Sequence, residues 1–207
     1  MKGGGGAGRP AGLILAGGAS RRMGRDKAGH PWGATTMLGA VSAALAPHCA
    51  ELIIAAAPDQ SLPATAGPPP LVVRDRVGGQ GPLRGLATGL AAAAARGHET
   101  VLTVATDMPL LSAAALDPLL EAARRAGPAT IVAPRVDGIV QPLCAVYPVA
   151  AAAEAEELLA AGRRSLRALL ARGEVSAVDL TGAAADPVRD FDTPAQVRDR
   201  SPGRGTC

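Results

Sequence analysis

A glycine-rich segment followed by a dense group of basic residues lies near the start of the sequence. The apolar run Leu13-Ile14-Leu15-Ala16 leads into Gly17 and Gly18, where backbone N–H groups can approach an anion because no Cβ intervenes. The cations that follow are Arg21, Arg22, Arg25 and Lys27. This order predicts a loop after a buried strand that binds a compact polyanion such as a triphosphate. The alternative is an ordinary strand-to-helix turn with solvated charges.

The sequence excludes two other phosphate-binding motifs, the dinucleotide-binding fingerprint and the P-loop. The stretch from Gly3 to Gly8 satisfies G-x-G-x-x-G, but no strand precedes it and no helix begins after it, so the context of a dinucleotide fingerprint is missing. The pattern G-x-x-x-x-G-K-[ST] occurs nowhere, which excludes a P-loop NTPase.

A single aspartate follows a second apolar, β-rich run, Thr100 to Ala105. In open α/β sheets ligands lie beyond the carboxyl ends of strands, and Asp107 would lie there. Mg²⁺ is usually held by one or two carboxylates together with substrate phosphates and water, so this one carboxylate could hold the ion beside a triphosphate. Asp107 could instead cap the next helix, although Ser112 is better placed to do so.

Short β-rich runs alternate with Ala- and Leu-rich segments of helical length, which is typical of an α/β fold built from βαβ units. We expect one domain, a Rossmann-like three-layer sandwich with a mostly parallel mixed sheet. The expected strands are 13–15, 51–57, 71–74, 100–105, 130–133, 139–147 and 175–180, and the expected helices are 36–45, 85–96, 112–125, 150–161 and 165–172. Asp137-Gly138 signals a hairpin, so an antiparallel excursion is expected there.

The expected domain covers residues 11–200, with a nucleotide-binding half at about 11–110 and an acceptor-binding half at about 111–200. Flexible tails are expected at 1–10 and 201–207.

Composition narrows the class of protein. Of 207 residues 48% are hydrophobic, yet Trp32, Tyr147 and Phe191 are the only aromatic ones, so the core must be aliphatic. No apolar run approaches the roughly 18 residues that span a bilayer, and glycines stand where a secretory signal would be apolar, so we expect a cytoplasmic protein that uses no membrane. A net charge of +3 without a basic and aromatic stripe gives no argument for nucleic-acid binding. The three cysteines are expected to be free thiols, and the three histidines structural or surface residues.

An ordered set of short motifs resembles the molybdenum cofactor guanylyltransferases over roughly residues 12–198. The N-terminal glycine-and-lysine signature is shared by many nucleotidyltransferases, so it is the whole ordered set that points to this family. The motifs are Leu15-Ala16-Gly17-Gly18, Arg22-Met23-Gly24, Asp26-Lys27, Asp75, Gly79-Gln80-Gly81-Pro82-Leu83-Arg84-Gly85, Asp107-Met108-Pro109, Gln141-Pro142-Leu143, Arg164-Ser165-Leu166 and Phe191-Asp192-Thr193-Pro194.

The resemblance implies transfer of GMP from GTP to the terminal phosphate of molybdopterin, with Mg²⁺ as cofactor and molybdoenzymes or their chaperones as possible recipients. It also implies roles for individual residues. Leu15, Ala16, Gly17 and Gly18 would line the nucleotide, Lys27 would contact its phosphates, Asp75 would help hold the guanosine portion, Gly81 would shape the cleft and Asp107 would bind Mg²⁺. The stretches 135–147 and 163–166 would face the pterin.

Two departures from the family pattern concern base choice. Family members often carry an asparagine after the second strand, where this chain has Ala55-Ala56-Ala57, and some relatives have asparagines where this chain has Asp190 and Asp192. A cytidylyltransferase for the same pterin, or another phosphate-acceptor nucleotidyltransferase, is therefore the alternative. A non-catalytic nucleotide-binding or delivery protein is the alternative of another class.

The attacking group in this reaction would be a phosphate monoester, already largely ionised near neutral pH because its second pKa is about 6. Positioning and charge neutralisation should therefore dominate catalysis. We expect Lys27 and Arg22 to act as the catalytic cations, with the amides of Gly17 and Gly18 steadying the phosphates. Arg22 could equally form an ion pair on the protein surface.

Overall fold

The computed structural model describes residues 8–17, 27–65, 67–75 and 79–188. Its centre is an eight-stranded sheet in the order β10-β7-β9-β6-β1-β4-β5, with the short strand β8 paired to β7. The strands are β1 (Ala11–Leu15), β4 (Leu52–Ala56), β5 (Leu71–Arg74), β6 (Thr100–Ala105), β7 (Ile131–Val136), β8 (Ile139–Val140), β9 (Cys144–Pro148) and β10 (Val175–Asp179).

The sheet is mostly parallel. β1 pairs in parallel with both β4 and β6, and β4 with β5, whereas β9 runs antiparallel to its neighbours β6 and β7. From β1 the chain moves outward to β4 and β5 and then crosses back to β6 on the other side of β1. The direction of strand addition therefore reverses between β1 and β6, and at such a reversal a crevice opens outside the carboxyl ends of the strands.

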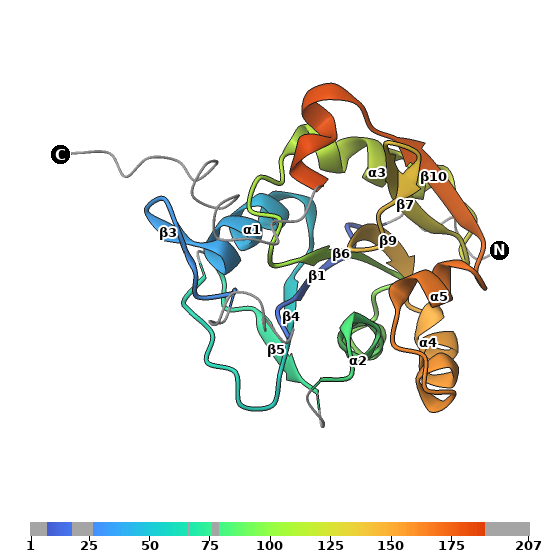
Figure 1. Cartoon of the computed structure of the whole chain (residues 1–207), viewed down its shortest axis with the longest axis horizontal. Helices are drawn as coiled ribbons and strands as arrows, with labels where there is room; N and C mark the ends of the chain where they lie inside the picture. The colour runs from blue at the N-terminus through green and yellow to red at the C-terminus, as the bar shows by residue number, and fades with distance from the viewer. Residues whose placement is uncertain (1–7, 18–26, 66, 76–78, 189–207) are drawn as a thin grey trace.

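Helices cover both faces of the sheet, as Figure 1 shows. On one face α1 (Met37–Leu45) and α3 (Ala113–Arg125) share a core with the side chains of Ile14, Ile54, Leu102 and Val104. On the other face α2 (Pro82–Ala95), α4 (Ala151–Ala160) and α5 (Leu166–Leu170) pack on Leu13, Leu15, Ile53 and Val101. The expected α/β three-layer sandwich is confirmed. Its division into two halves near residue 110 stays a prediction.

The α2 helix lies unusually close to the central strand. A Cβ added to Gly89 would lie 2.4 Å from a methyl carbon of Leu13, and one added to Gly85 would lie 3.3 Å from a methyl carbon of Leu15. Small residues on this face therefore let the helix backbone approach β1, which fits a core that is aliphatic and close-packed.

A small hairpin outside the main sheet precedes α1. It consists of β2 (Pro31–Trp32) and β3 (Thr35–Thr36), and its Trp32 packs with Met37 and Leu110 in a separate apolar cluster. Thr36 is the N-cap of α1, and its hydroxyl accepts a hydrogen bond from the Gly39 N–H. The structure thus packs the segment that follows Lys27 against the segment that follows Asp107.

Most expected elements are present, although α2 begins at Pro82 and not at Gly85. The predicted continuous strand 139–147 is wrong: it is broken at 141–143, between β8 and β9. Pro142 has no N–H to donate to a ladder. Pairing with β6 begins at Leu143, whose carbonyl accepts a hydrogen bond from the Ala105 N–H. The Asp137-Gly138 turn is confirmed, with φ of 51° and 78°.

None of the helices in the described segments is long and apolar enough to cross a membrane. Two of the three cysteines, Cys49 and Cys144, lie within the described residues, and both are free and buried. Residues 1–7 of the expected N-terminal tail, the 201–207 tail and the motif around Phe191 lie outside the described residues.

Candidate functional site

A pocket of about 420 Å³ lies at the carboxyl ends of β1 and β6 and the start of α2. This is the position at which the strand order reverses. Seven of the expected site residues line it, namely Leu15, Ala16, Gly17, Lys27, Asp75, Gly81 and Asp107. The other two, Gly18 and Arg22, lie outside the described residues. The structure therefore brings together positions that are widely separated in the sequence.

Lys27 and Asp107 meet in this pocket as an ion pair. The Nζ of Lys27 lies 2.8 Å from Oδ2 of Asp107, and the two side chains are 20% and 16% exposed. Asp107 does not cap α3, because the N-cap position belongs to Ser112. The capping alternative for Asp107 is therefore wrong, and the carboxylate faces a pocket with a cation beside it.

The floor of the pocket is fixed by hydrogen bonds between strand ends. The hydroxyl of Thr106 donates to the Leu15 carbonyl at 3.0 Å, and the Thr106 N–H reaches the same carbonyl at 3.3 Å. Thr106 is a pocket residue that the sequence analysis missed. It holds the end of β6 against the end of β1, and so places Asp107 in the same pocket as Ala16 and Gly17.

Gly17 has a different role from the one expected for its amide. The Gly17 N–H donates to the Ala55 carbonyl at 3.0 Å, so this amide already has a partner within the sheet. A Cβ at this position would lie 3.0 Å from the Ala57 nitrogen. Glycine is needed here because two backbones cross closely.

Asp75 lines the far side of the pocket just after β5. Burial raises the pKa of its carboxyl, and the hydrogen bond from the Thr88 hydroxyl at 3.0 Å and the charge of Arg84 act in the opposite direction. Its own N–H donates to the Ala56 carbonyl, which continues the β4–β5 pairing by one residue. Asp75 is thus a half-buried acceptor held in a fixed place.

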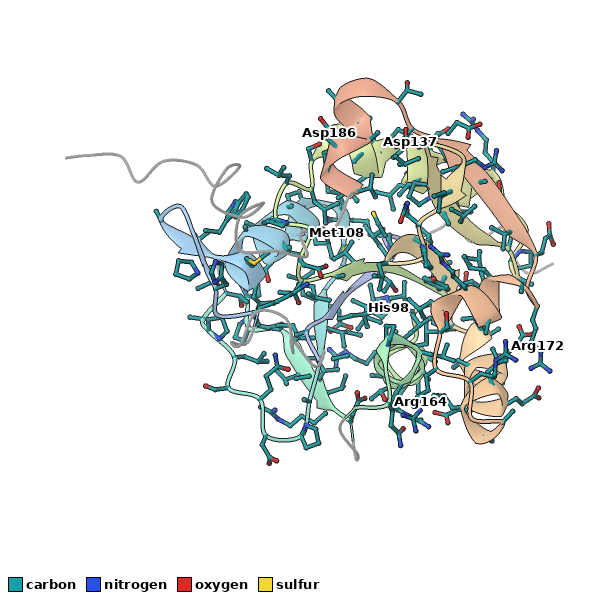
Figure 2. The ribbon with its side chains drawn as sticks, in the orientation of Figure 1. His98, Met108, Asp137, Arg164, Arg172 and Asp186 are labelled. Carbon is teal, nitrogen blue, oxygen red and sulfur yellow. The ribbon has the colours of Figure 1, made fainter. Side chains whose placement is uncertain are left out.

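The N-terminus of α2 also opens onto the pocket. Gly81 is its N-cap with φ of 79°, and Pro82 occupies the first turn. A Cβ at Gly81 would lie 3.0 Å from the Arg164 carbonyl oxygen, so the turn before α5 packs closely against the N-cap of α2. Figure 2 shows Arg164 beside the start of α2. The free N–H groups and partial positive charge of a helix N-terminus favour an anion here.

The two stretches expected to face the pterin are not equally close to this pocket. From 135–147, Leu143 lines it, whereas Arg135 and Asp137 line a second hollow of about 450 Å³ beside β10. Tyr147 is buried and donates its hydroxyl to the Pro142 carbonyl at 2.7 Å. From 163–166, the Nη1 of Arg164 lies 3.4 Å from the Gly79 carbonyl at the pocket rim.

Within the part of the chain that the structure describes, Asp107 is the carboxylate that lies beside Lys27. Within the described residues there is no cluster of three or more His, Cys, Asp or Glu side chains that could hold a metal ion. Hard oxygen ligands suit Mg²⁺, which commonly keeps water and substrate phosphates as its other ligands. The donor set at Asp107 fits an ion that arrives with a triphosphate better than a permanently bound metal.

Comparison with known proteins agrees with this geometry. The model of the MobA-like NTP transferase domain matches residues 12–178. A probable molybdenum cofactor guanylyltransferase of Mycobacterium avium is 42% identical over 162 residues, which cover 77% of this chain and 80% of the relative. Another from Mycobacterium marinum is 38% identical over 192 residues, which cover 91% and 93% of the two chains.

Solved structures show the same fold. Molybdopterin-guanine dinucleotide biosynthesis protein A from Archaeoglobus fulgidus superposes with a TM-score of 0.72 at 20% identity, over 92% of this chain and 96% of that one. A 2-C-methyl-D-erythritol 4-phosphate cytidylyltransferase from Thermus thermophilus gives a TM-score of 0.68 at 21% identity, over 92% and 96%. The family match over most of the chain, together with relatives about 40% identical, identifies this protein as a nucleotidyltransferase that belongs to the MobA-like NTP transferase family.

Proposed function

We propose that this protein transfers GMP from GTP to molybdopterin, forming the guanine dinucleotide form of the cofactor and releasing pyrophosphate. The observation that carries the proposal is the pocket in which Lys27 and Asp107 face each other at the carboxyl ends of β1 and β6. The relatives named as molybdenum cofactor guanylyltransferases support the choice of substrates.

The reaction needs no strong general base from the protein. A phosphate monoester is largely a dianion near neutral pH, with a second pKa of about 6, so it can attack the α-phosphorus without a strong general base. The difficulty is the approach of one polyanion to another. Cations and fixed dipoles at the pocket therefore supply most of the rate enhancement.

Lys27 is the cation best placed to hold the phosphates, since its ammonium group already lies in the pocket beside Asp107. A triphosphate would draw Lys27 away from that carboxylate and leave Asp107 to bind Mg²⁺. When bound, Mg²⁺ would neutralise charge on the phosphates and on the leaving pyrophosphate. Arg22 remains a candidate second cation, although it lies outside the described residues.

The nucleoside would lie toward Asp75 and the end of β4. Asp75 provides a half-buried acceptor that can bind sugar hydroxyls or base N–H groups. Where an asparagine would be expected, Ala57 lines the pocket and offers no polar side-chain group. Base recognition therefore depends on the backbone and Asp75, and GTP is the expected substrate.

The test is a comparison of nucleotides under one set of conditions. The protein is incubated with Mg²⁺, molybdopterin and either GTP, CTP or ATP, and released pyrophosphate is measured. We expect release with GTP and little with the others. Release with CTP alone would support the cytidylyltransferase alternative, which the fold shared with the Thermus thermophilus enzyme also permits. Binding of GTP without any release of pyrophosphate would support a delivery protein.

A further inference from the structure

The side chain of Gln60 bridges the ends of two central strands. Its Nε2 donates to the Ala16 carbonyl just after β1 at 3.0 Å, and its Oε1 accepts from the Ala57 N–H just after β4 at 3.0 Å. Ala16 and Ala57 both line the pocket, while Gln60 lies behind them and is not among the lining residues. Gln60 therefore contacts the pocket wall from the protein side.

This bridge replaces a bond of the sheet. β1 and β4 are parallel with Leu15 opposite Ala55, and the Ala16 N–H continues the ladder by donating to the Ala55 carbonyl at 2.9 Å. The next bond of a parallel ladder would run from the Ala57 N–H to the Ala16 carbonyl. In its place stands the carboxamide of Gln60, which offers one donor and one acceptor to these two groups.

The loop that carries Gln60 is held from its other side by Arg74. The Nη1 of Arg74 lies within hydrogen-bond distance of the carbonyls of Ala57, Pro58 and Gln60, at 2.8, 3.2 and 3.0 Å. The carboxamide is thus fixed by its own backbone as well as by its partners. The strands stop pairing directly at the point where Gly17 crosses Ala57.

We propose that Gln60, held in place by Arg74, is a positioning residue that sets the opening between β1 and β4 and so the place where the glycine-rich loop begins. The proposal rests on the nucleotide-binding function proposed above. It assigns Gln60 no contact with substrate. Its contribution is that Ala16, Gly17 and Ala57 are already in place before GTP arrives, so binding does not have to order them.

The two hydrogen bonds of Gln60 differ in direction, and this difference allows a sharp test. Gln60→Glu keeps the shape of the side chain. At high pH the new carboxylate can accept from the Ala57 N–H, but its second oxygen faces the Ala16 carbonyl oxygen without a proton between them. Below about pH 4.3, the ordinary pKa of a glutamate side chain, the protonated carboxyl can donate to Ala16 again. Gln60→Leu removes both bonds at every pH.

The experiment is calorimetric titration of GTP with Mg²⁺ into wild-type protein, Gln60→Glu, Gln60→Leu and the exposed control Asp59→Asn, at about pH 8 and about pH 4. Each dissociation constant is divided by the wild-type value at the same pH. We expect about tenfold weaker binding by Gln60→Glu at the higher pH and recovery to within about twofold at the lower. Gln60→Leu should be about tenfold or more weaker at both, and Asp59→Asn should match wild type.

Binding by both Gln60 variants within twofold of wild type at both pH values would overturn the proposal. Equally weak GTP binding by Gln60→Glu at both pH values would also overturn the proposal, because restoring the hydrogen bond to the Ala16 carbonyl would then have no effect. Should both variants fail to fold, Arg74→Met decides, because the Arg74 side chain is exposed and we expect several-fold weaker GTP binding. Unchanged binding by that variant would refute the proposal. Failure of wild-type protein to bind GTP would instead refute the proposed function.

Discussion

Replacing Asp107 with asparagine should separate its contribution to stability from its contribution to catalysis. Asn keeps the size of the side chain but removes the negative charge that Mg²⁺ requires of a hard oxygen ligand. It also removes the negative charge that lies 2.8 Å from the Lys27 ammonium in the native protein. The substitution therefore affects both folding stability and catalysis, and the size of each effect is derived separately.

The stability effect follows from the partial burial of the pair. At an effective dielectric constant of about 20, unit charges at this separation attract by about 6 kcal/mol, and desolvation opposes most of that gain. Because the two side chains keep 20% and 16% of their exposure, the loss should lie between that of a surface pair and that of a buried one. We expect Asp107→Asn to lower the free energy of unfolding by about 2 kcal/mol.

The effect on catalysis should be larger than the effect on stability. Without the carboxylate, guanylyl transfer should fall at least about a hundredfold, and excess Mg²⁺ should restore little of it. In the double variant Asp107→Asn/Lys27→Met, stability should return toward wild type because both charges of the ion pair are removed together. Activity should not return.

The assay pairs calorimetric unfolding with pyrophosphate release from GTP, with Asp59→Asn as an exposed control for the loss of one carboxylate. Near-normal transfer by a well-folded Asp107→Asn protein would refute the assignment of the metal to Asp107. Asp75, in the same pocket, would then be the next candidate, followed by Asp192, which lies outside the described residues.

Four further predictions concern the same pocket. Lys27→Ala should weaken GTP binding and turnover while the protein stays folded, and normal turnover in a steady-state assay would make Lys27 a merely structural partner of Asp107. GTP with Mg²⁺ at about 100 times its dissociation constant should stabilise the fold by about 2.7 kcal/mol, more than CTP or ATP at equal concentration, and equal shifts in calorimetric melting would remove the guanine assignment. Burial raises the pKa of Asp75 above its ordinary value of 3.8, so the folded state holds the proton more tightly and stability falls as pH rises through the folded pKa. Asp75→Asn should therefore raise the melting temperature of the free protein at neutral pH but not below about pH 3.8. A gain that persists in acid would contradict this reasoning. Gly81→Ala should destabilise the fold by about 1 to 3 kcal/mol and weaken GTP binding, because φ is 79° and the new Cβ would lie 3.0 Å from the Arg164 carbonyl oxygen. An unchanged melting temperature would show that the turn before α5 can move aside.

The sequence predicted the fold where local patterns are strong. The strand 100–105 and the strand 71–74 have the bounds expected, because apolar runs with clear breaks at both ends leave little choice. The start of α2 was placed too late, at Gly85, because Gly81-Pro82 reads as a turn. In the structure Gly81 caps the helix and Pro82 opens it, as proline can in a first turn. The β2–β3 hairpin was missed because two-residue strands carry no periodic signal.

The candidate site was predicted better than its internal bonds. Lys27 and Asp107 were found through residue type and position at strand ends, although 80 residues separate them. Gln60 was missed because its partner Ala16 lies 44 residues away and a single glutamine in a loop has no distinguishing pattern. The Gly17 amide was assigned to phosphate because sequence cannot show that the Ala55 carbonyl already accepts its proton.

The position of Trp32 gives this protein an internal optical probe. It is the only tryptophan in the chain, and it packs with Met37 and Leu110 in the cluster that joins the segment after Lys27 to the segment after Asp107. Trp32 is 4% exposed, so its emission reports on this junction. Any movement that separates Lys27 from Asp107 when a nucleotide enters would alter the surroundings of that indole, and stopped-flow fluorescence could follow the movement without a label.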